Sequence, residues 1–128
     1  MKFTKILMIS LVALLFVGCR TDPVYNVTDA SVVVGSKSVT LEDVEGAIKR
    51  AGVGLGWAMK PVRPGLMEAT LFLRTHMAKV EIPYSTSSYS ITYKDSVDLD
   101  YDGTKIHSNY NGWIQNLDNA IRTQLMNL

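Results

Sequence analysis

Three aspartates at alternate positions have the spacing in this chain that points most directly to chemistry. Asp98, Asp100 and Asp102 precede Gly103. This spacing matches the first half of a calcium-binding loop, in which oxygen ligands alternate and a glycine permits a sharp turn. The twelfth position of such a loop normally supplies a bidentate carboxylate, but here it is Asn109. The sequence therefore favours an acidic, solvated loop, with calcium binding as the alternative.

The two histidines of the chain are the next candidates for acid–base or metal chemistry. A histidine acts as a general acid or base only with a suitable partner close to it in space. His76 lies between two predicted strands and His107 lies just before the last predicted helix, and neither has a partner at a diagnostic spacing. A turn residue and a capping residue are the favoured interpretations. We therefore expect no catalytic residues, no cofactor and no metal site, and so no enzyme.

The N-terminus has the order of a secretory signal peptide. Lys2 and Lys5 form a positively charged start, and residues 6–17 form an uncharged, apolar run. This run is about half the length of the roughly 20 residues that cross a bilayer as a helix. The pattern therefore favours a signal segment over a transmembrane helix.

The only cysteine of the chain, Cys19, directly follows the small residue Gly18 at the end of this run. The stretch resembles the lipobox of bacterial lipoproteins, Leu-(Ala/Ser)-(Gly/Ala)-Cys, with Phe16 in place of leucine. We expect residues 1–18 to be cleaved as a lipoprotein signal peptide and Cys19 to carry acyl chains such as palmitate. The alternative is an ordinary signal peptide that happens to be followed by a cysteine.

Lipidation would anchor the remaining chain to a membrane. Stable anchoring takes more than one acyl chain, because each buried methylene contributes only about 0.8 kcal/mol. Arg20 follows the cysteine where an aspartate would signal retention, so resemblance to enterobacterial sorting favours the outer membrane, with the domain facing the periplasm. A single cysteine cannot form an internal disulfide, and a lipidated one offers no thiol nucleophile.

The length and net charge of the mature chain restrict the number of domains and the classes of partner. Removal of residues 1–18 leaves 110 of the 128 residues, enough for one domain. Loss of two lysines leaves 11 basic against 12 acidic residues, a net charge of −1. A near-neutral domain lacks the basic excess typical of nucleic-acid binding. We therefore expect no nucleic-acid partner.

Hydrophobic periodicity predicts an α+β fold. Residues 19–39 are expected to form a lipidated tether and an extended segment, and residues 40–128 a single domain. In that domain, spacings of three and four predict helices, and period-two alternation predicts strands. Two helices packed on one face of an antiparallel sheet of three to four strands are therefore expected. The helices are placed at about 41–51 and from Asn109 to the C-terminus, and the strands at 54–60, 66–74, 76–84 and 89–93.

Aromatic residues could build a partner surface or a ligand cleft. Phe72 alternates with polar residues on the face of its strand that is expected to be solvated. Trp57, Tyr84 and Tyr110 are further candidates for such a surface, although most aromatic side chains of a small domain belong to its core.

With these motifs in view, the chain resembles a family of small proteobacterial outer-membrane lipoproteins to which no activity is assigned. The resemblance covers nearly the whole chain and rests on Leu-Phe-Val-Gly-Cys (15–19), Pro-Val-Tyr-Asn-Val (23–27), Val-Glu-Ile-Pro-Tyr (80–84), Tyr-Ser-Ile-Thr-Tyr (89–93) and the NYNGWIQNL-type helix at 109–117. It implies the localisation and a compact α+β domain, but no mechanism. We expect a membrane-anchored, non-enzymatic module that binds an envelope protein or has a structural role; a small-ligand or calcium-binding protein is the alternative.

Overall fold

The computed structural model describes residues 20–35 and 38–128. The expected signal peptide and Cys19 lie outside these residues. Two helices and seven strands follow one another in the described part, with bounds as follows: β1 Thr21–Pro23, β2 Val27–Ser31, α1 Leu41–Gly54, β3 Ala58–Arg63, β4 Leu66–Leu73, β5 His76–Pro83, β6 Ser88–Val97, β7 Lys105–His107 and α2 Ser108–Met126.

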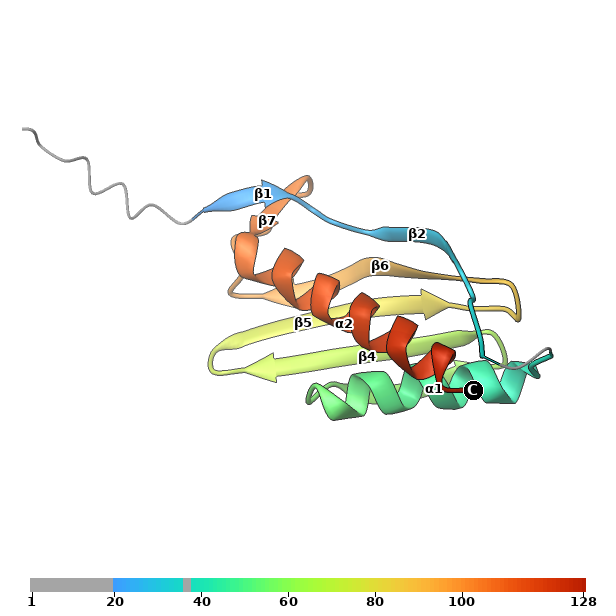
Figure 1. Cartoon of the computed structure of the whole chain (residues 1–128). Coiled ribbons are helices and arrows are strands. Elements are labelled where there is room, and N and C mark those ends of the chain that lie inside the picture. The colour runs from blue at the N-terminus through green and yellow to red at the C-terminus, as the bar shows by residue number, and fades with distance from the viewer. Residues whose placement is uncertain (1–19, 36–37) are drawn as a thin grey trace, which may run out of the picture.

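The α+β prediction is confirmed, and the predicted number of strands is too low. Five strands form one antiparallel sheet in the order β2-β6-β5-β4-β3, and β1 pairs with β7 in a separate two-stranded sheet. Both helices lie against the same face of the five-stranded sheet (Figure 1). The opposite face of this sheet is not covered by either helix.

The first helix is longer than its sequence predicts. Thr40 caps α1, because its hydroxyl accepts the Asp43 N–H while the Asp43 carboxylate accepts the Thr40 N–H. Gly52 does not end the helix. It lies inside α1, where the missing side chain leaves room for Met59 of β3. The left-handed residue that follows the helix is Gly56, at φ +87°.

Strand β3 continues past the predicted end of this strand at residue 60 and includes a proline. Pro61 belongs to β3 and faces Met67 of β4. Because β3 is an edge strand, a missing N–H can be tolerated there, as it could not be in the centre of a sheet. The turn is confined to the residues between Arg63 and Leu66, and Gly65 adopts φ +88°.

The segment before residue 40 takes part in the fold. β1 aligns Thr21 with His107 and Pro23 with Lys105, and β2 adds an edge strand beside β6. β7 falls in the stretch 95–108 that the sequence predicts as a loop. Each strand of the β1–β7 pair has three residues, too few for an alternating pattern to identify it. The described part of 19–39 therefore belongs to the same folded unit as the rest.

The core lies between the two helices and the sheet. Tyr110, Ile114 and Leu117 of α2 are fully buried, as are Val44 and Ile48 of α1. The sheet contributes the residues that the alternation predicts to point inward: Met67, Ala69, Ala78, Val80, Ile82 and Ile91. Among the described residues, no helix is both long and apolar enough to span a bilayer.

Candidate functional site

The uncovered face of the sheet is a surface of mixed charge with an apolar end. Alternation along β4 and β5 sends one set of side chains to the helices and the other set outward. The cross-strand register places Glu68 opposite Glu81, Thr70 opposite Lys79, and Phe72 opposite Met77. We call this surface, formed by the outward residues of β4, β5 and β6, the open face.

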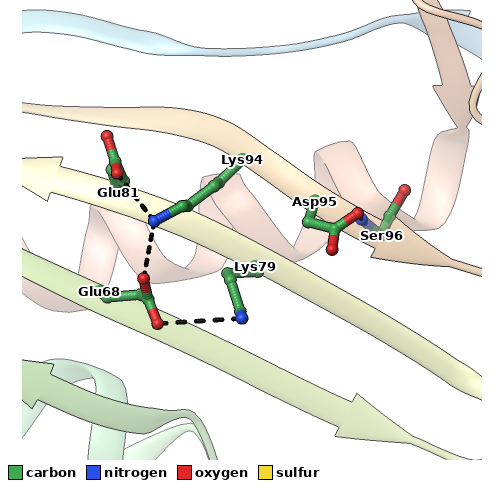
Figure 2. Close-up of polar contacts among 6 residues, drawn as sticks. All are labelled: Glu68, Lys79, Glu81, Lys94, Asp95 and Ser96. Atoms are coloured by element: carbon green, nitrogen blue, oxygen red, sulfur yellow. Dashed lines mark hydrogen bonds and ion pairs between the residues drawn. The ribbon is translucent and has the colours of Figure 1, made fainter.

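Lys94 of β6 holds the charged part of the open face together. Like charges directly opposite each other on neighbouring strands repel. The Lys94 ammonium lies 2.8 Å from Glu68 Oε2 and 3.0 Å from Glu81 Oε1, so it bridges the two carboxylates (Figure 2). Lys79 adds a longer contact of 3.9 Å to Glu68. The ion pairs thus connect the four side chains in the order Lys79–Glu68–Lys94–Glu81.

The ion pairs also set the protonation of this network. The hydrogen bond from Lys94 lowers the pKa of the Glu68 carboxyl, and the two carboxylates raise the pKa of Lys94. Glu68 therefore stays ionised to lower pH than an isolated glutamate. Since all four side chains are partly solvated, the network defines a charge pattern more than it stabilises the fold.

Phe72 is the most exposed large apolar side chain of the described residues, with 72 % of its surface accessible. It lines a shallow hollow of about 270 Å³ together with residues of β3, β4 and β5, among them Thr70, Met77 and Lys79. An exposed aromatic ring beside a fixed charge pattern is typical of a surface that binds a partner.

The other three aromatic candidates are not available for a surface. Trp57 is 4 % exposed, Tyr84 is 6 % exposed and Tyr110 is fully buried. Each lies between the sheet and the helices and belongs to the core cluster. Their expected place on a partner surface is therefore wrong: these large side chains bury more apolar area inside the domain than a surface position would allow.

Two of the three aspartates of the acidic loop, Asp98 and Asp102, accept hydrogen bonds within the fold. The Asp102 carboxylate accepts the N–H groups of Thr104 at 2.9 Å and Lys105 at 2.7 Å, and these bonds lower the pKa of Asp102. The Asp98 carboxylate accepts the Thr75 hydroxyl. Within residues 20–35 and 38–128, no three acidic, histidine or cysteine side chains gather into a possible metal site.

An open hollow of about 670 Å³ lies beside this loop. The rings of Tyr93 and Tyr101 stack at its wall, with centroids 4.2 Å apart. Asp95, Asp98 and Asp100 also line the hollow. Aromatic faces next to carboxylates are suited to a small cationic ligand.

Both histidines have structural partners. His76 Nδ1 lies 2.6 Å from the carbonyl oxygen of Asp98, and its ring packs against Trp113 with centroids 6.3 Å apart. His107 is the N-cap of α2, where its Nδ1 accepts the Asn109 N–H at 3.1 Å. His107 occupies the capping position predicted from the sequence, whereas His76 is not a turn residue: it is half-buried and is the first residue of β5.

One buried polar cluster is not apparent from the sequence. Asp118 of α2 is only 7 % exposed, although the helical pattern places it outside the apolar stripe. It accepts the Tyr89 hydroxyl at 2.5 Å and pairs with Arg122 Nε at 3.1 Å. Burial, followed by the Asp118 carboxylate, raises the pKa of Tyr89. The available signal was the Asp–Arg pair four residues apart, which does not reveal a tyrosine from β6.

No protein-family model, curated protein or solved structure matches this chain.

Proposed function

We propose that this protein is a lipid-anchored domain on the periplasmic side of the bacterial outer membrane. The proposal is carried by the lipobox-like stretch ending at Cys19, which follows a charged start and an uncharged run of signal-peptide length. The fold is consistent with it, because Arg20 and Thr21, directly after this cysteine, are bonded to Ser108 and aligned with His107. Arg20 in the position after the cysteine supports export to the outer membrane.

We further propose that the domain works by binding an envelope protein through the open face, without catalysis. Phe72 supplies an exposed apolar anchor, and the network around Lys94 supplies a fixed charge pattern. A partner surface of this kind combines an apolar centre with a polar rim. The residues considered for acid–base chemistry have structural partners: His76 contacts the Asp98 carbonyl oxygen, and His107 caps α2.

Cross-linking in intact cells tests the proposed interaction. A photoreactive side chain at position 72 is expected to give a discrete cross-linked protein species, and Lys94→Glu in the same chain is expected to weaken it by reversing the central charge. The matched control is the same photoreactive residue at position 62, because Val62 is also well exposed on the same sheet, at 48 %. Equal cross-linking from both positions, or none from position 72, would remove the open face as a binding surface.

A second candidate function is the binding of a small cationic ligand in the hollow beside Tyr93 and Tyr101. The stacked rings and the three aspartates at the wall of the hollow support it. Calcium is the disfavoured version of this candidate, because the Asp102 carboxylate is already satisfied by N–H groups of its own loop.

Millimolar calcium is therefore expected to leave the melting temperature of the protein unchanged. A ligand that binds only the folded state raises this temperature, and the rise grows with the ratio of the ligand concentration to the dissociation constant. Magnesium at the same concentration serves as the control for ionic strength. A rise with calcium alone, abolished by Asp100→Asn, would establish an ion site in the loop.

A further inference from the structure

We propose that the domain lies directly on the bilayer and contacts the lipid headgroups through one particular end of the fold. We call this end the anchor end and define it by Arg20, the last residue of β4 (Leu73), the turn residues Arg74 and Thr75, and Val97. The inference rests on the proposed lipidation of Cys19 and adds to it an orientation and a contact surface.

The first observation is that the fold leaves no tether. The Arg20 carbonyl oxygen accepts the Ser108 N–H at 2.9 Å, and Thr21 aligns with His107 in the β1–β7 pair. A lipid on Cys19 would therefore be attached one residue away from the first ordered backbone contact. Because a lipoprotein without a linker cannot move far from its acyl chains, the end of the fold that carries Arg20 must remain at the membrane surface.

The second observation is that the β4–β5 hairpin turn lies at the same end. His107, next to Ser108, donates its N–H to the Leu99 carbonyl oxygen at 2.8 Å. The neighbouring residue Asp98 contacts His76, the first residue of β5. In Figure 1, the start of β1, the start of α2 and the turn between β4 and β5 accordingly lie together on the left.

The third observation is the chemistry of the side chains at the anchor end. Leu73 is 45 % exposed and Val97 is 53 % exposed, so two apolar side chains face solvent there. Arg20 and Arg74 are both exposed beside them. Apolar side chains that enter the acyl boundary, with arginines extending to the phosphates, form the usual pattern of an interfacial contact.

The acidic residues nearby set the expected lipid dependence. Asp98 lies at the anchor end with its carboxylate engaged by Thr75, and Asp22 and Asp100 are exposed on the neighbouring residues of β1 and the acidic loop. These charges offset the two arginines. The contact should therefore depend on apolar insertion and the acyl chains, and only weakly on anionic lipid.

The opposite end of the sheet supplies a matched control. β4 runs from the β3–β4 turn to the β4–β5 turn. Val62 lies beside the first turn and Leu73 beside the second, at opposite ends of the sheet. Their exposed fractions, 48 % and 45 %, are nearly equal. A probe at either position therefore differs mainly in its expected distance from the membrane.

Lipid quenching of a fluorescent probe tests the inference. Because Cys19 is the only cysteine of the chain, a lipidated protein has no free thiol, and Leu73→Cys or Val62→Cys creates one. Each full-length variant, purified with its lipid and reconstituted into zwitterionic vesicles, is labelled with a thiol-reactive fluorophore. Lipids that carry a spin label near the headgroup are expected to quench the probe at position 73 about threefold or more over that at position 62. Adding anionic lipid should change this ratio little.

The possible outcomes separate the inference from the anchor on which it rests. Labelling of the protein without an added cysteine would show that Cys19 is free, and would count against the lipid anchor itself. A lipidated protein quenched equally and weakly at both positions would overturn the inference and leave the anchor intact. A cysteine at position 73 that is protected from thiol labelling in native membranes but not in vesicles would also overturn the inference. In that case a protein, and not the lipid, would cover the anchor end.

Discussion

Full-length protein carrying Cys19→Ala is expected to leave the membrane fraction, with about a tenfold or greater loss of membrane-bound protein. The expected reason is that the acyl chains on Cys19 supply the apolar burial that holds the domain at the membrane. The measurement is the distribution between membrane and soluble fractions after export, with the wild-type chain treated in parallel.

The control for this experiment is the stability of the released domain. The contacts of Arg20 with Ser108 and of Thr21 with His107 do not involve the substituted side chain, so we expect the melting temperature to stay unchanged. Cys19→Ala protein that stays in the membrane after a high-salt wash would show that something other than a lipid on this residue holds the chain. Contact through the anchor end alone is too small to produce that result.

Removal of two buried tyrosine hydroxyls is expected to have opposite consequences for stability. Tyr89→Phe should lower the free energy of unfolding by about 1.5–3 kcal/mol, because it removes a buried hydrogen bond to an ionised carboxylate. Tyr110→Phe should be neutral or stabilising, because within the described residues the buried Tyr110 hydroxyl has no hydrogen-bond partner. Chemical denaturation of the two variants measures both effects.

The third member of the cluster provides the control. Arg122 is about half exposed at its side chain, 51 %, so Arg122→Ala should cost less than about 1 kcal/mol. The expected order of destabilisation is therefore Tyr89→Phe, Arg122→Ala and Tyr110→Phe, from most to least. If Tyr89→Phe and Tyr110→Phe lowered the free energy of unfolding equally, the hydrogen bond from Tyr89 to Asp118 would contribute little to stability.

The parts of the fold that the sequence predicts are those with local causes. The Thr40–Asp43 capping box marks the start of α1, and the alternation in β4 and β5 identifies both strands and the face that Met67 and Val80 bury. These signals need only neighbouring residues. The same alternation places Phe72 on the face away from the helices, where the structure finds it exposed.

The parts that the sequence does not predict depend on distant segments. Thr21 finds its partner His107 at the far end of the chain, and three-residue strands carry no pattern of their own. Asp118 is buried because Tyr89 of β6 reaches it, which a helical pattern cannot reveal. The sequence positions of Trp57 and Tyr84 fit a surface as well as a core, and the packing of the folded chain buries both.

The measurement that tests the central proposal most directly is the intact mass of the mature protein recovered from outer-membrane fractions. If Cys19 carries the lipid anchor, the mature chain begins at Cys19 and has the added mass of acyl chains. Leu73 and Arg74 would then lie at the membrane surface, and the charged part of the open face around Lys94 would extend into the periplasm. A mature chain of unmodified mass, or one cut at another residue, would contradict the lipid anchor and bring the hollow beside Tyr93 and Tyr101 forward as the functional site.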